Sequence, residues 1–288
     1  VVDKFAGMIT PASSNVFDGV LLADAQAASS PAQLFAIADK IVDGVDVAGY
    51  GLVRLKAGNV YVTTSSYFVP GGTTSASVQR AVNVAQAEDT VNIADGTYVG
   101  QVAIIGKDLS LLGASEAGTI LQAPAILGTS FTTSTSNKAV VYANNGTVNF
   151  SDLTIDGNRQ GSTNYRLVGL AYFNASGTAD HLIIKNVMDS TFTGNQAGNA
   201  YYAYNTVGTH TVSISESTIL DYQKNGITAN GTGLTVYITN NVVTGQNVEG
   251  INGQNGIQIG FDALGYVSGN TVSGNRYSSN LMGDTGSG

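Results

Sequence analysis

The chain has 288 residues, which is enough to bury the core of one large domain or of two ordinary ones. Twelve basic residues stand against twenty acidic ones, and the formal charge of -8 repels phosphate, which argues against nucleic acids and anionic membranes as partners. The absence of cysteine excludes disulfides, thiolate metal sites and cysteine nucleophiles, and no apolar run is long enough to predict a transmembrane segment.

Two amphipathic helices are predicted near the start of the chain. In "SPAQLFAIADKIV", apolar residues recur at helical spacing from Leu34 onward, and Ser30 with Gln33 predicts a capping box. The same spacing begins at Val78 in "TSASVQRAVNVAQ".

A similar strand follows each of these helices, as "GLVRLKAGNVYV" and "DTVNIADGTYVG". The two strands match when Val53 is aligned with Val91, because the same shift also aligns Gly58 with Gly96. This pattern indicates an internal helix-then-strand repeat.

From about residue 90 the sequence consists of short alternating strands separated by Asn, Gly, Ser and Asp. One series of strands recurs at similar intervals, and a second repeats "NGITAN" as "NGIQIG", with "VGLAYF" about two repeats earlier. Two strand series with one common period predict an all-β fold, a right-handed parallel β-helix (solenoid) with short N-terminal capping helices. We expect residues 1–87 to form the capping region and residues 88–288 the β-helix. The first series starts at Phe150, Ile184, Ile214, Ile238 and Val267.

Several of these segments resemble known β-helix proteins. The run from Val78 to Leu121, which contains "GTY" at the end of a strand, resembles the opening of proteins with the pectin-lyase-like superfold. "DYQKNGI", "NGIQI" and "VSGNTVSGN" are similar to bacterial right-handed parallel β-helix repeat proteins. This resemblance implies a fold that carries many activities. The sequence lacks the esterase patterns "QDTL" and "DFIFG", the lyase pattern "WIDH" and the epimerase pattern "DPHD". Any enzymatic function must therefore be argued from individual residues.

The best candidate for catalysis is Lys224 with Asp221 and Tyr222 in "DYQKNGITANG". Polysaccharide lyases on this superfold need a basic side chain to take the proton beside a uronate carboxylate, commonly with calcium held by Asp residues. The alternative is a hydrogen-bonded corner, since aligning "KNGI" with "QNGI" places Lys224 over Gln254 in the next coil. We predict no metal site and no cofactor, with calcium left open as the alternative.

Tyrosines offer a candidate ligand surface. Tyr172 lies in "NYRLVGLAYF", and Tyr202 and Tyr204 lie in "NAYYAYN", where strand alternation places both on one face. Aromatic side chains flanked by amides suit stacking and hydrogen bonding to a sugar. The alternative is that some of these tyrosines belong to the core or stack between coils.

These observations favour a secreted or cell-surface bacterial protein with a structural or adhesive role, such as an adhesin or a surface-layer protein. Its expected partners are a polysaccharide or cell-surface glycan and further copies of itself. The alternative function is a polysaccharide lyase acting on an acidic, uronate-containing glycan.

Overall fold

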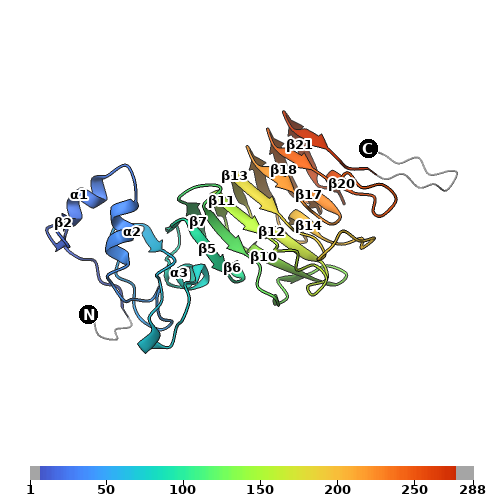
Figure 1. The fold of residues 1–288 in the computed structure, drawn as a ribbon. Helices are drawn as coiled ribbons and strands as arrows, with labels where there is room; N and C mark the ends of the chain where they lie inside the picture. The colour runs from blue at the N-terminus through green and yellow to red at the C-terminus, as the bar shows by residue number, and fades with distance from the viewer. Residues whose placement is uncertain (1–6, 277–288) are drawn as a thin grey trace.

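The computed structural model describes residues 7–276 and shows a stack of β-coils with a helical cap at its N-terminal end (Figure 1). One face of the stack is a parallel sheet that we call the pocket sheet. Its strands are β6 (Val102–Ile105), β10 (Ser136–Asn144), β12 (Leu167–Phe173), β14 (Asn199–Tyr204), β17 (Asn225–Asn230) and β20 (Asn255–Gly260), and β9 (Phe131–Thr132) pairs antiparallel with β10.

Two further rows of parallel strands complete each coil. The second row consists of β3 (Asn59–Val62), β4 (Thr90–Ile93), β7 (Leu109–Gly113), β11 (Val148–Asp156), β13 (Gly177–Lys185), β15 (His210–Ser215), β18 (Leu234–Thr239) and β21 (Leu264–Ser268). The ends of β11 and β13 continue into a third row with β5 (Gly96–Val99), β8 (Thr119–Gln122), β16 (Thr218–Leu220), β19 (Val242–Thr244) and β22 (Thr271–Ser273). The chain is therefore a right-handed parallel β-helix, as predicted.

In five successive coils, a left-handed residue forms the corner between the second and third rows. In this conformation the strand bends sharply, and the next side chain can turn inward. The position stacks in register from coil to coil, which keeps all the corners in one line along the rod. The residues with positive φ at this corner are Asp152 (55°), His181 (51°), Glu216 (47°), Asn240 (59°) and Gly269 (69°).

The predicted register is confirmed for the pocket sheet, where Asn225 lies beside Asn255, and for Ile214, Ile238 and Val267 in the second row. It is wrong for Ile184, which lies past the corner of β13 and pairs with Ile155 and Ile219 in the third row. Ala179 is the residue of that coil that stacks between Phe150 and Ile214.

The helix-then-strand repeat is also corrected. Strands β3 and β4 pair Val91 with Val60 rather than with Val53, so the two strands stack with a shorter offset than the sequence match indicated. The parallel sheet consequently begins at β3, before residue 88.

The cap contains β1 (Val16–Phe17), β2 (Val20–Leu21), α1 (Leu22–Ala27), α2 (Ala32–Ala38), the 3-10 turn η1 (Val69–Gly71) and α3 (Val78–Val84). Helix α3 is confirmed, since Val78, Ala81 and Val82 are buried in the main core and Ser77 caps its first turn. The capping box predicted for α2 is wrong. Pro31 is its N-cap, without a side-chain cap bond, because Ser30 Oγ accepts instead from Ala32 N.

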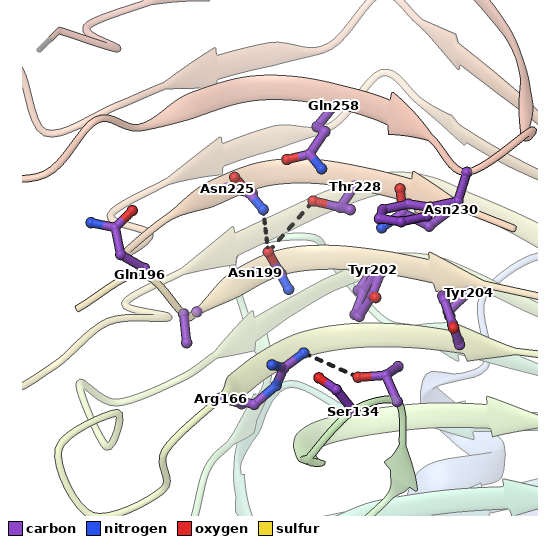
Figure 2. A pocket seen from close by; sticks show the side chains of 14 residues that line it. Ser134, Arg166, Gln196, Asn199, Tyr202, Tyr204, Asn225, Thr228, Asn230 and Gln258 are labelled. Carbon is purple, nitrogen blue, oxygen red and sulfur yellow. Dashed lines mark hydrogen bonds between the residues drawn. The ribbon is translucent and has the colours of Figure 1, made fainter.

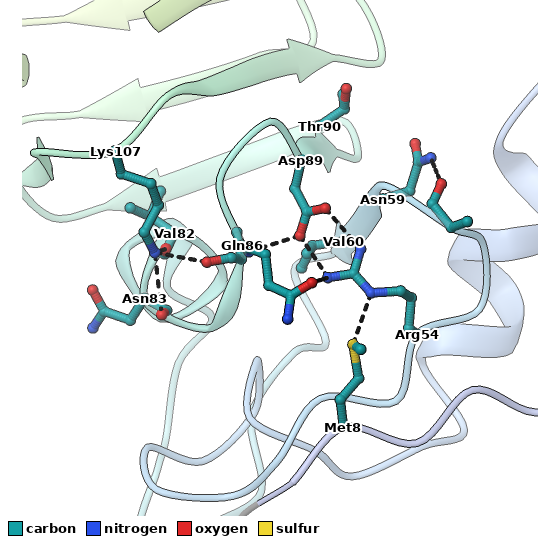
Figure 3. A network of polar contacts seen from close by, with 12 residues as sticks. Met8, Arg54, Asn59, Val60, Val82, Asn83, Gln86, Asp89, Thr90 and Lys107 are labelled. Atoms are coloured by element: carbon teal, nitrogen blue, oxygen red, sulfur yellow. Dashed lines mark hydrogen bonds and ion pairs between the residues drawn. The ribbon is translucent and has the colours of Figure 1, made fainter. Parts of the chain in front are cut away.

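A buried ion pair joins the cap to the first coils (Figure 3). Arg54 donates from Nη1 and Nη2 to the two carboxylate oxygens of Asp89 at 2.8 and 2.7 Å, and both side chains are 5% exposed. Lys107 Nζ donates to the carbonyls of Val82 and Ala85 at the end of α3. These contacts fix the end of the rod that α3 covers. No helix within residues 7–276 is long and apolar enough to cross a membrane.

Candidate functional site

A cavity with a volume of about 380 Å³ lies on the outer face of the pocket sheet (Figure 2). Its lining residues lie on β14, β17 and β20 and in the loops beside them, and three strands about 4.8 Å apart span roughly 10 Å. Amides and hydroxyl groups predominate among its lining residues, which are Thr133, Ser134, Arg166, Gln196, Ala197, Gly198, Asn199, Tyr202, Tyr204, Asn225, Thr228, Asn230, Gln258 and Phe261.

Packed aromatic rings support one side of this pocket. Phe131 stacks on Phe173 with ring centroids 5.0 Å apart, and Phe173 stacks on Tyr204 at 6.1 Å. Tyr202 packs against Phe131 and Tyr204 at 5.8 Å each. Because neighbouring coils supply each ring with a partner, the aromatic wall is fixed before any ligand arrives.

A ladder of amides runs along the opposite side. Asn225 Nδ2 donates to Asn199 Oδ1 at 2.7 Å, and Asn255 Nδ2 donates to Asn225 Oδ1 at 2.9 Å. Thr228 Oγ1 also points to Asn199 Oδ1, at 3.5 Å (Figure 2). The ladder forms because parallel coils stack identical residues in register, so each amide donates to the coil before it.

Two lining groups have hydrogen-bonding capacity that the described residues do not use. Asn230 is 6% exposed, and its Oδ1 has no partner within residues 7–276. The space beside Asn230 Oδ1 is open because the next coil carries Gly260, which has no side chain, at the paired position. Arg166 donates from Nε to Asn137 at 3.0 Å and from Nη2 to Thr133 at 3.1 Å, and among residues 7–276 it is the only charged residue that lines the pocket. The pocket thus offers a buried acceptor and a fixed cation.

The structure does not bring the predicted catalytic residues together. Tyr222 is fully buried, its OH donates to Asn275 Oδ1 at 2.6 Å, and burial raises its pKa. Asp221 has a φ of 52° at a corner and accepts from Gln246 Nε2 at 2.9 Å. Lys224 Nζ donates to the carbonyl of Gly253, and burial lowers its pKa. The three side chains make separate contacts, and none of them lines the pocket.

Of the predicted ligand tyrosines, Tyr202 and Tyr204 line the pocket, and the placement of Tyr172 is corrected. Tyr172 pairs with the inward-facing Ala203 and is 1% exposed. Its OH donates to the carbonyls of Val148 and Thr178 at 2.9 and 2.8 Å, and burial raises its pKa. It is a core residue and does not face a ligand on the outer surface.

Sequence reasoning did not identify Arg166, Asn230 or Phe261. Asn230 could have been found from the register, since it stacks beside Tyr204 in the next coil. Arg166 and Phe261 lie outside the strands and gave no periodic signal. No group of three or more Asp, Glu or His side chains within residues 7–276 is arranged to hold a metal ion.

No known family profile matches the sequence, and neither does any curated protein. Among solved structures, the chain is similar to a pectin methylesterase mutant in complex with a hexasaccharide, at 13% identity and a TM-score of 0.39, over 69% of this chain and 71% of that one. It is also similar to pectin methylesterases from Erwinia chrysanthemi (13%, 0.38, 65% and 66%) and from carrot (14%, 0.39, 70% and 63%).

Proposed function

We propose that this protein binds a glycan in the pocket on the outer face of the pocket sheet, and that it acts as a structural or adhesive protein, secreted or displayed on a bacterial cell surface. The observation that carries this proposal is the composition of the pocket. A fixed aromatic wall at Tyr202 and Tyr204 faces a ladder of amides, and exposed Phe261 stands at one end. Aromatic faces take the apolar side of a sugar ring, and amides and hydroxyls take its OH groups.

The charges favour an acidic glycan. The chain carries a net charge of -8, yet the described part of the chain contributes one cation, Arg166, and no acidic residue to the pocket lining. A guanidinium held by Asn137 and Thr133 loses little conformational entropy on meeting a carboxylate. Asn230 Oδ1 is then available to accept a bond from a sugar hydroxyl.

The same charge pattern supports the alternative function, a lyase acting on a uronate-containing glycan. Such a reaction needs a base at the bound sugar, and the lining residues include no Lys, His, Asp or Glu. Arg166 is the basic group that the pocket offers, whereas Lys224 bonds a backbone carbonyl elsewhere. We therefore place binding first and lyase chemistry second.

Self-association is part of the proposal for a different reason. The last described coil exposes apolar side chains, with Leu264 62%, Tyr266 55% and Val272 46% exposed. Strands β20, β21 and β22 have no further partner strand within residues 7–276. Unpaired parallel edges with apolar side chains are suited to pairing with another chain.

Binding can be tested by calorimetry with neutral and uronate-containing oligosaccharides. Tyr204→Ala should weaken binding about fivefold, because it removes roughly 1 kcal/mol of aromatic contact. Arg166→Gln should weaken binding of the acidic oligosaccharide by about 10- to 100-fold and leave any neutral one unaffected, since a charge-assisted hydrogen bond contributes about 1.5–3 kcal/mol.

The matched control is Tyr237→Ala on β18, which removes a tyrosine that is 41% exposed and lies outside the pocket. Equal losses of affinity in the Tyr204 and Tyr237 variants would contradict the assignment of the pocket. Ultraviolet absorbance from an unsaturated product, lost in Arg166→Gln, would favour the lyase instead.

A further inference from the structure

One wall of the pocket is a loop, residues 189–198, that we call the wall loop. Its last residues, Gln196, Ala197 and Gly198, line the cavity directly before β14. A second loop, residues 245–254, precedes β20. This loop lies against the wall loop, because a Cβ atom added at Gly194 would be 3.3 Å from the carbonyl oxygen of Ile251. The wall loop therefore depends on its neighbour for support.

The segment from Tyr222 to Lys224 lies between these two loops. Gln223 is 1% exposed, and its Nε2 donates to the carbonyl of Thr193 while its Oε1 accepts from the backbone N–H of Asp189. The backbone N–H of Lys224 donates to the carbonyl of Gly198 at 2.9 Å. This segment thus holds the wall loop from one side.

Asn252 holds the wall loop from the other side. It is 0% exposed, and its Nδ2 donates to the carbonyls of Asn195 and Gln223 at 2.7 and 2.8 Å. Its Oδ1 accepts from Gln196 Nε2, a side chain of the pocket itself, at 2.8 Å. All the hydrogen-bonding groups of this buried amide are therefore directed at the two neighbouring segments.

Lys224 completes the arrangement through the residue next to Asn252. Its Nζ donates to the carbonyl of Gly253, and its half-buried side chain makes no ion pair within residues 7–276. A cation placed on a backbone carbonyl in partial burial is a strong, directional contact. The path from Lys224 therefore runs through its hydrogen bond to the Gly253 carbonyl, along the backbone to Asn252, and through a second hydrogen bond to Gln196 in the pocket wall.

We propose that Lys224 and Asn252 form a clamp that orders the wall loop and thereby sets the affinity of the pocket. Lys224 acts on the ligand through the loop, as a positioning residue, without touching it. This inference rests on the proposed glycan binding at the same pocket. It explains why a lysine follows Tyr222 and Gln223 at a coil corner with no carboxylate beside it.

The test uses the full chain and a uronate-containing oligosaccharide, with calorimetry for affinity and hydrogen exchange for the order of residues 189–198. Lys224→Met should weaken binding about tenfold and speed exchange in the wall loop, while the melting midpoint changes little. Lys224→Arg should restore both quantities, because it keeps a cationic donor. Asn252→Ala should have the same two effects as Lys224→Met and serves if the latter folds poorly.

The control is Lys185→Met on β13, which removes the same charge in a neighbouring coil outside both loops. Unchanged exchange and affinity in Lys224→Met would overturn the clamp. So would an affinity that Lys224→Arg fails to restore while exchange is normal, because Lys224 would then touch the ligand. A wild-type protein that binds no oligosaccharide would contradict the proposed function instead, and the exchange of residues 189–198 alone would then decide the clamp.

Discussion

Asp46 in the cap shows how burial changes the chemistry of a single residue. Its side chain is 7% exposed, and its Oδ2 accepts from the backbone N–H of Asp43 at 3.0 Å. Burial raises its pKa to about 6, and the pKa of neighbouring Asp43 is raised for the same reason. Asp43 accepts from the N–H groups of Val45 and Val53, so the two carboxyls hold the turn below α2.

This environment predicts a pH-dependent stability. An unfolded Asp titrates near 3.9, so between about pH 4 and 6 the folded protein keeps a proton at Asp46 that the unfolded chain has lost. The free energy of unfolding should therefore fall as pH rises through this window. In Asp46→Asn, the free energy of unfolding should fall by less over this pH range, the difference from the wild type being on the order of 1–3 kcal/mol. Urea unfolding at several pH values measures it.

The test compares how the free energy of unfolding changes with pH in the wild type and in Asp46→Asn, because other carboxyls titrate in the same range and contribute equally to both. Asp262→Asn, at an exposed position, provides the control. Parallel pH profiles for the wild type and Asp46→Asn would contradict the prediction.

At the scale of single elements, the corners between the second and third rows determine how one coil sits on the next. Asn241 follows a left-handed corner residue and is 1% exposed. It accepts from Ser217 N at 3.0 Å and donates to the carbonyl of Ile214 and to Asn270 Oδ1 at 2.9 Å each. One buried amide thus links three successive coils.

Asn241→Ala should cost about 2–4 kcal/mol of unfolding free energy, because it leaves the buried N–H of Ser217 and the carbonyl of Ile214 without partners. Chemical denaturation measures this loss. Asn240→Gly is the control at the adjacent corner, where the next coil already carries Gly269 with a φ of 69°. It should cost less than about 1 kcal/mol, and an equal cost in both variants would contradict the role of the Asn241 side chain in linking the coils.

Much of this architecture could be predicted from the sequence, because identical residues of neighbouring coils stack on one another. Asn225 and Asn255 fixed the register of the pocket sheet in this way. Ile184 was assigned to the wrong row, since β13 continues through its corner and both Ala179 and Ile184 face inward, so periodicity could not choose between them.

The same reasoning explains which parts of the site were predicted. Alternation along β14 correctly put Tyr202 and Tyr204 on one face. Alternation alone, however, does not tell which of the two sets of side chains on a strand faces the core. Only the pairing of Tyr172 with Ala203 shows that β12 turns this ring inward. Arg166 comes from a turn, where no periodic pattern applies.

At the scale of the whole molecule, the cap matters because a stack of coils has two ends that need cover. Helix α3 places Ala81 against the same core that contains Val60 and Val91 of the first coils. In such a linear array each coil contacts only its neighbours, so a defect at one end is felt there first. The cap and the pocket are accordingly expected to respond to different mutations.

Arg54→Met tests this separation. It leaves the buried carboxylate of Asp89 without its cation, and the expected cost is about 3–5 kcal/mol because an unpaired carboxylate would stay buried. Amide exchange should rise in β3 and β4 and remain unchanged in β17 and β20, while affinity for the oligosaccharide is retained. Arg54→Met combined with Asp89→Asn should recover part of the loss, since the neutral amide can still accept the bond from Gln86 N. A uniform rise in exchange along the rod would mean instead that the coils unfold as one cooperative unit, and the cap would then control the pocket as well.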